Sequence, residues 1–188
     1  MKPSLFYNYR NIGDVLIVVI NPFLVATRHV NNKDITVLYN NNEIIGYNIF
    51  NISQIIKIHH QGLLVSPIKP LVDVINNILK NHDLPQLMYD DNPSFIVGKV
   101  VDAKNDIYFI DIKEEIVQVQ YRFTDININD LVVYIKPDTM CLNARISHLA
   151  RLGTKRLLML EDNDEILKLD DEKLIGSDFY SGEVKWSN

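Results

Sequence analysis

The sequence predicts two small domains: an α+β unit over residues 1–90, mostly antiparallel strands with one helix, and an all-β barrel over residues 93–188. Short β-branched apolar runs recur along the whole chain. The first half also holds one segment whose apolar residues have helical spacing. A polar stretch with a proline, Tyr89–Ser94, separates the halves. Because 47% of the 188 residues are hydrophobic, each half can bury its own core.

The first half begins with strand patterns. Val15–Ile20 is a continuous apolar run, which indicates a buried strand. Ile35–Tyr39 and Glu43–Phe50 are two further strands, and the asparagines at 40–42 between them tolerate positive φ, so a hairpin is predicted. In Gln54–His59, the residues Ile55, Lys57 and His59 alternate with Ile56 and Ile58, which predicts one more strand.

A helix follows these strands. Pro70 stands near its start, and Leu71, Ile75, Ile78 and Leu79 fall on one face at helical spacing. The helix is expected to end near residues 81–83, before Pro85. It therefore provides one apolar face to pack on the sheet.

Beyond residue 94 the pattern returns to strands with little helix between them, which favours a small barrel. The predicted strands are Phe95–Val101, Ile107–Ile112, Ile116–Tyr121 and Leu131–Ile135.

The last third of the chain is less regular. Asn143–Arg156 fits either a short helix or two short strands around Gly153. Leu157–Leu160 is predicted to be a strand, and the acidic segment Glu161–Asp178 is expected to pack back through Ile166 and its neighbours.

Composition restricts the function. The net charge of −5 and the pI of about 5.5 lack the basic balance usual in nucleic-acid binders, so any such binding needs a local patch. Cys141 is the only cysteine, which excludes an internal disulfide and a cysteine metal cluster. The apolar run at 15–20 is too short to span a bilayer, and no secretory leader is evident. We therefore expect a soluble cytoplasmic protein without membrane association.

Four segments carry a family resemblance: Phe6–Asn8, Gly13–Val18, Gly46–Asn51 and Phe95–Val101. Together they resemble the YtpR family, in which a family-specific N-terminal domain precedes a tRNA-binding OB-fold. The resemblance implies a YtpR-like α+β domain at 1–90 and a divergent OB-fold-like barrel at 93–188. It also implies a translation-related role and a possible homodimer. The loops after Phe95–Val101 differ from the family pattern, so only Lys99 carries over as a basic residue of that strand.

Basic residues of the second half form the candidate RNA-binding set. Arg145 to Arg156 holds four cations and no acid, and cations of this kind neutralise phosphates. Residues from the barrel strands and loops could join them. The full set is Lys99, Lys104, Arg122, Arg145, Arg151, Lys155 and Arg156. The alternative is a solvated basic face balanced by the acids at 161–172.

These features predict a non-catalytic RNA-binding protein, for tRNA or another structured RNA, with no cofactor and no metal. The alternative is a protein-interaction or scaffold module that associates with a synthetase, the ribosome or itself. His59 and His60 would point to opposite faces of a strand, so they do not predict a shared metal site. A catalytic site around these histidines or Asp90 is the third hypothesis.

Overall fold

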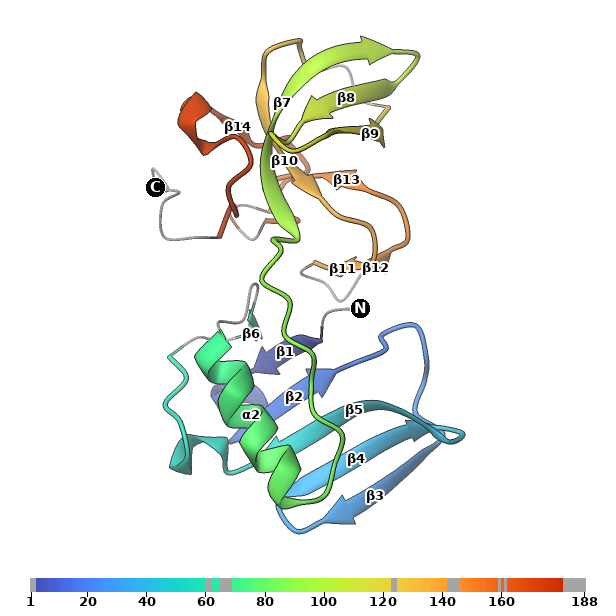
Figure 1. Cartoon of the computed structure of the whole chain (residues 1–188), viewed down its shortest axis with the longest axis vertical. Coiled ribbons are helices and arrows are strands. Elements are labelled where there is room, and N and C mark those ends of the chain that lie inside the picture. Colours follow the sequence, from blue (N-terminus) through green and yellow to red (C-terminus); the bar gives the residue numbers. More distant parts are fainter. Residues whose placement is uncertain are drawn as a thin grey trace. The chain divides into compact units, whose positions relative to one another are not determined.

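The computed structural model describes residues 3–59, 62–64, 69–122, 125–141, 146–158, 160 and 162–180. The chain divides into two compact units, residues 1–91 and 92–188, and each is described by itself. The regular structure of the described residues is mostly strand, in two six-stranded sheets and a two-stranded one (Figure 1).

The first unit is built on an antiparallel sheet in the order β3-β4-β5-β2-β1-β6. Its strands are β1 (Ser4–Tyr7), β2 (Val15–Val19), β3 (Arg28–Asn32), β4 (Ile35–Asn40), β5 (Glu43–Phe50) and β6 (Gly62–Leu64). A four-residue helix, α1 (Tyr9–Ile12), connects β1 to β2. The predicted hairpin is confirmed: β4 pairs with β5, and Asn41 in the turn has a φ of 52°.

One face of this sheet is covered by α2 (Lys69–Asn81), whose bounds match the predicted helix. Figure 1 shows the helix lying across the strands. Its residues Val72, Ile75 and Leu79 are buried against the sheet core. The fully buried Tyr47 donates its hydroxyl hydrogen to the carbonyl of Pro85 at 3.0 Å, which holds the chain that leaves α2. Sheet and helix thus share one hydrophobic core.

The strand predicted at Gln54–His59 is wrong. The chain instead forms a 3-10 turn, η1 (Ile52–Gln54), and residues 55–59 have no regular structure. Asn51 adopts a left-handed conformation with φ 56°, which turns the chain out of β5. The carboxylate of Asp14 accepts hydrogen bonds from the Ser53 amide at 3.1 Å and the Ser53 hydroxyl at 2.6 Å. These bonds hold the turn, and Ile52 is buried beneath it.

The second unit is a curled, barrel-like antiparallel sheet in the order β13-β10-β7-β8-β9, with β14 also paired to β10. Its elements are β7 (Phe95–Lys104), β8 (Ile107–Asp111), β9 (Ile116–Gln120), β10 (Leu131–Ile135), β13 (Arg151–Leu152) and β14 (Lys168–Leu169). A small hairpin of β11 (Thr139–Met140) and β12 (Ile146–Ser147) and a 3-10 turn, η3 (Glu172–Leu174), complete it.

Strand β7 is the longest and is shared between two pairings. Its residues 95–99 pair with β10, and residues 99–104 pair with β8. A bulge interrupts the second pairing between Val100 and Asp102, and Figure 1 shows β7 as a long bent ribbon. Gly98 precedes the bend, and a Cβ there would lie 2.4 Å from a methyl carbon of Ile110. The close approach of β8 therefore requires glycine.

The curled sheet has a core on its inner side, and the two ends of the sheet meet there because β13 contacts β9. The inner side chains include Ile96, Val100, Tyr108, Ile110, Val119, Val132, Leu152 and Ile166. The first half of β7 is covered on its free edge by residues 176–179, where the Val97 amide donates to the Ser177 carbonyl at 3.0 Å.

Two expectations for the last third are now decided. In the described part of 143–156 the chain forms two short strands, β12 and β13, rather than a helix, but both precede Gly153 instead of flanking it. The strand predicted at Leu157–Leu160 is wrong, because residues 155–158 form a turn in which the Leu158 amide donates to the Thr154 carbonyl at 2.9 Å. Gly153 lies against Leu158 and Val133, so this turn packs on β10.

Gly46→Ala tests the packing of the first sheet. A Cβ at this position would lie 2.5 Å from the Val18 carbonyl oxygen, a backbone atom that cannot move without breaking the β2–β5 pairing. We expect a loss of about 1–3 kcal/mol in the free energy of unfolding of this unit, measured by urea denaturation followed by circular dichroism. The control is Asn48→Ala in the same strand. An equal loss in both variants would contradict the packing argument.

Asp14→Asn tests the carboxylate beneath η1. Burial opposes ionisation, but hydrogen bonds from Ser53 and from the Tyr7 hydroxyl outweigh it and lower the pKa of Asp14. The carboxylate therefore stabilises the fold above the unfolded-state pKa of about 3.9, and this contribution is lost as pH falls through the lower folded-state pKa. The melting temperatures of the wild type and of Asp14→Asn should differ at pH 7 and converge near pH 2. A gap independent of pH would refute this role, and Asp34→Asn is the control.

Candidate nucleic-acid interface

Strands β7, β8 and β9 present one continuous outward face. Val100, Tyr108 and Val119 point into the core, so the residues that alternate with them point outward. We call these side chains the outer face: Lys99, Asp102, Lys104, Ile107, Phe109, Asp111, Ile116, Gln118 and Gln120.

Cross-strand pairing fixes the neighbours on this face. Phe109 in β8 lies opposite Asp102 in β7 and Gln118 in β9. In the next row, Ile107 lies opposite Lys104 and Gln120. Residues directly opposite in an antiparallel pair have Cβ atoms about 5 Å apart. The partly buried ring of Phe109 is thus surrounded by amide, carboxylate and ammonium groups.

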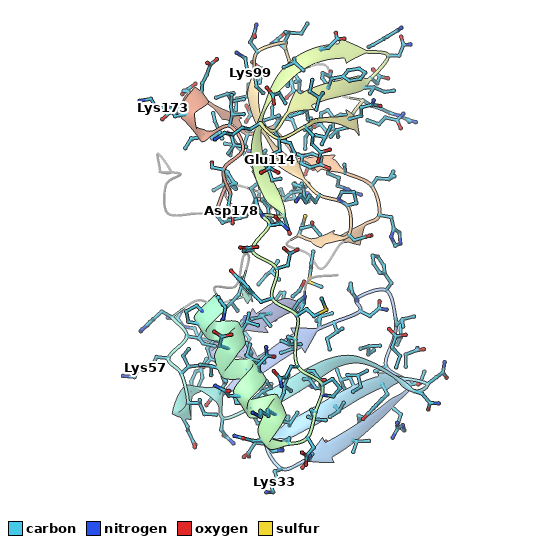
Figure 2. The ribbon with its side chains drawn as sticks, in the orientation of Figure 1. Lys33, Lys57, Lys99, Glu114, Lys173 and Asp178 are labelled. Atoms are coloured by element: carbon cyan, nitrogen blue, oxygen red, sulfur yellow. The ribbon has the colours of Figure 1, made fainter. Side chains whose placement is uncertain are left out.

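The structure divides the predicted cations between two places. Lys99, which Figure 2 labels, and Lys104 belong to the outer face. Arg122 is exposed two residues after Gln120. Arg151 belongs to β13, and Lys155 and Arg156 lie in the turn after it. Arg145 lies outside the described residues.

Three of the six described candidate cations are paired with carboxylates. The Lys99 ammonium lies 2.7 Å from a Glu172 carboxylate oxygen, and that of Lys155 lies 2.9 Å from Glu165. The Arg156 guanidinium approaches Asp162 at 3.3 Å and Asp164 at 3.5 Å.

Lys104, Arg122 and Arg151 form no ion pair within the described residues. Of these three, Lys104 belongs to the outer face, and Arg122 follows the strand that ends at Gln120. Of the described candidate cations without an ion pair, two therefore lie at the β7–β8–β9 side and one, Arg151, lies in β13.

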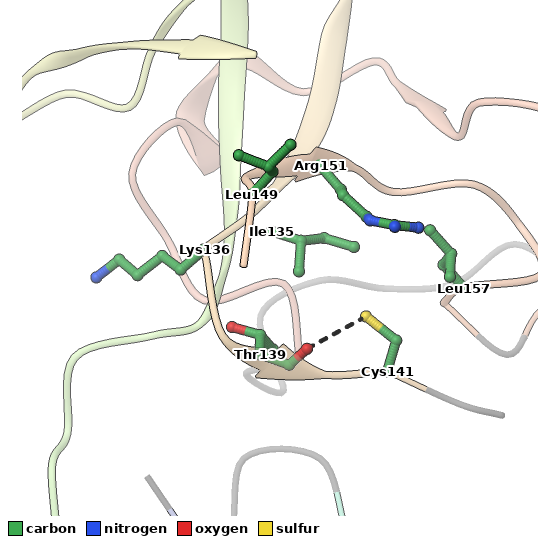
Figure 3. Close-up of a pocket in the computed structure, with 7 residues that line it drawn as sticks. All are labelled: Ile135, Lys136, Thr139, Cys141, Leu149, Arg151 and Leu157. Carbon is green, nitrogen blue, oxygen red and sulfur yellow. Dashed lines mark hydrogen bonds between the residues drawn. The ribbon is translucent and has the colours of Figure 1, made fainter. Parts of the chain in front are cut away.

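A shallow depression lies at β13. Figure 3 shows Cys141, Thr139, Leu149, Arg151 and Leu157 around it, and it is too narrow to hold a water molecule. The Cys141 thiol faces the Thr139 carbonyl at 4.0 Å. Burial raises the pKa of this thiol to about 11, and the charge of Arg151 offsets burial only in part. The site is thus unsuited to nucleophilic chemistry at neutral pH.

The histidines at positions 59 and 60, the candidate metal or catalytic residues of the first unit, gain no support from the structure. His59 lies in the irregular segment after η1, and His60 lies outside the described residues. In the part of the chain that the structure describes, no three His, Cys, Asp or Glu side chains gather as a metal site requires. Within those same residues no helix has the length and apolar character needed to cross a membrane.

Sequence reasoning missed the residues between the cations. Phe109, Gln118 and Gln120 join the outer face because the strands at 107–111 and 116–120 alternate inward and outward side chains. That alternation was available in the sequence. The Glu172–Lys99 pair was not, because 73 residues separate its members.

The comparisons with known proteins concern the first unit. Residues 26–91 match a family model described as "Domain of unknown function (DUF4479)". The match runs from just before β3 to the segment after α2 and includes no strand of the second unit. No curated protein matches the chain.

The reactivity of Cys141 offers a direct test of its environment. Because burial raises the thiol pKa to about 11, the thiol stays protonated at pH 8 and reacts slowly with Ellman's reagent. We expect one thiol to appear only after urea is added, monitored by absorbance. Thr139→Ser serves as the control in the same depression. Prompt reaction of the folded protein would contradict the buried, protonated thiol.

Proposed function

We propose that this chain binds RNA without catalysis and that the outer face of β7, β8 and β9 is the contact surface. In this proposal the first unit is a YtpR-like α+β domain and the second a divergent OB-fold-like barrel. The shared strand β7, its bulge and the curled five-strand path support that assignment. OB-fold barrels bind oligonucleotides across the same kind of strand face.

The single observation that carries the proposal is the chemistry gathered around Phe109. An aromatic ring offers a surface for an unpaired base, and Gln118 and Gln120 offer amide groups for base edges. Lys104 and Arg122 stand near enough along the strands to meet phosphates. Stacking, base-edge and phosphate groups thus occur on one surface.

The ligand class follows from these groups. Bases inside a duplex cannot reach an aromatic side chain, so the target is a structured RNA with unpaired nucleotides, and tRNA is the leading candidate. With Lys99, Lys155 and Arg156 engaged by carboxylates, few cations remain to neutralise phosphates. Binding is therefore weak and transient, in keeping with a cytoplasmic role beside the translation machinery.

One observation favours a second candidate function, a protein-interaction or scaffold module. Ile116 on the outer face is 61% exposed, and Ile107 and Phe109 lie on the same face. An apolar surface with paired charges at its margin is suited to a protein partner or to a second copy of this chain. Under this alternative, Lys104 and Arg122 contribute little to the affinity for the protein partner, and Ile116 contributes most.

An anisotropy titration separates the two functions. The probes are unfractionated tRNA and a fluorescein-labelled 12-nucleotide oligouridylate, titrated at 50, 100 and 200 mM NaCl. We expect binding whose log–log salt slope is shallow, about −1 to −2, because two cations are free near the outer face. Phe109→Leu should weaken binding about fivefold or more by removing a stacking surface.

Charge variants complete this test. Lys104→Gln and Arg122→Gln should each weaken binding and flatten the salt slope by about 0.7. Lys57→Gln, an exposed lysine in the first unit, is the matched control and should bind like the wild type (Figure 2). Absence of binding to both probes at 50 mM NaCl would overturn the RNA proposal. The scaffold function would be supported instead if the wild type binds a protein partner and the variant Ile116→Gln no longer binds it.

A further inference from the structure

The stretch of residues 162–172, which we call the acidic strap, brings carboxylates onto cations of the second unit. Asp162 and Asp164 contact Arg156, Glu165 contacts Lys155, and Glu172 contacts Lys99. Three of the six described candidate cations are therefore engaged by one continuous segment of the same chain. Four carboxylates of this segment thus lie against three cations.

The strap is fixed in position by its backbone and by buried groups. Ile166 is buried in the barrel core and forms a bridge with Thr154. β14 pairs with β10, and the Lys168 ammonium lies 2.7 Å from the Asp130 carboxylate. Burial opposes ionisation of Asp130, but the bonds from Lys168 and from the Asn127 amide lower its pKa. The carboxylates of the strap are thus held beside the sheet.

The contact with Lys99 bears most directly on the outer face. Lys99 is the residue at which β7 passes from its β10 pairing to its β8 pairing. Its side chain is only 24% exposed, while that of Glu172 is 68% exposed. The Glu172 backbone opens η3, where the Asp171 carboxylate accepts a bond from the Lys173 amide. The lysine is therefore confined, and the glutamate can swing away without unfolding η3.

The strength of the Lys99–Glu172 ion pair determines how easily an RNA phosphate replaces the carboxylate at the Lys99 ammonium. An exposed ion pair is weak, so a phosphate can displace the carboxylate, but the affinity for the phosphate falls by the cost of that exchange. A carboxylate left beside the phosphate also repels it.

From these observations we infer that the acidic strap is a built-in competitor that occupies the Lys99 ammonium and limits phosphate binding at the outer face. This inference rests on the proposed RNA-binding function and concerns the regulation of that same surface. It assigns Glu172 as the carboxylate that an RNA phosphate must displace.

Glu172→Gln tests the inference, with Asp170→Asn as the matched control. Both variants raise the net charge by one within the same segment, but Asp170 makes no contact with a cation in the described structure. The probes are the 12-nucleotide oligouridylate and unfractionated tRNA at 50 and 200 mM NaCl. We expect Glu172→Gln to tighten binding about two- to fivefold and to steepen the salt slope by about 0.7, with little change for Asp170→Asn.

The double variant Lys99→Gln/Glu172→Gln identifies the cation. It should lose the gain of Glu172→Gln, because the freed ammonium is absent, and its melting temperature reports that the fold is kept. Equal gains from Glu172→Gln and Asp170→Asn would overturn the inference while leaving RNA binding intact. An unchanged affinity in Glu172→Gln would do the same. If neither the wild type nor any variant binds either probe, the proposed function fails and the inference falls with it.

Discussion

In the second unit, β7 hydrogen-bonds to β10 through its first half and to β8 through its second half, and both pairings include Lys99. This sharing makes the sheet curl, because the two neighbouring strands are reached from opposite edges of one bent strand. Gly98 permits the close approach of Ile110, and the bulge after Val100 follows at once. The core, the outer face and the position of Lys99 all depend on this geometry.

Charge in this unit is organised locally, although the whole chain is acidic. Cations that follow β13 meet carboxylates of the acidic strap within 3.5 Å, and Lys99 meets Glu172 across a much longer sequence separation. Exposed pairs of this kind add little stability, so their main effect is on which charges a ligand encounters. The ligand-accessible charge is therefore different from the charge counted along residues 145–156.

Regular elements with strong local signals could be predicted from the sequence. The helix at 69–81 shows in the spacing of Leu71, Ile75 and Leu79, and Leu131–Ile135 forms the predicted strand. The polar edge strand β3 could not be predicted, because most of its side chains are exposed and show no alternation.

Two local patterns misled because groups outside each pattern decided the structure. Residues 54–59 alternate like a strand, but the Asp14 carboxylate binds Ser53 from 39 residues away and holds a turn. In the basic run, Lys155 and Arg156 are paired with acids only six to ten positions further along the chain, as the balanced basic face offered as the alternative requires. Such tertiary hydrogen bonds and ion pairs leave no periodic trace, so the cations could be named from the sequence but their availability could not.

The bulge after Val100 also determines which side chains share a surface. Lys104 lies five positions after Lys99, so in an uninterrupted strand the two side chains would point to opposite sides of the sheet. The extra residue at position 101 restores the parity, and both lysines face outward. In a regular strand of the same residues without the bulge, the inward and outward sets over 102–104 would be exchanged while the composition stayed the same. The chemistry displayed by this barrel is thus encoded by the count of residues in β7 as much as by their identity.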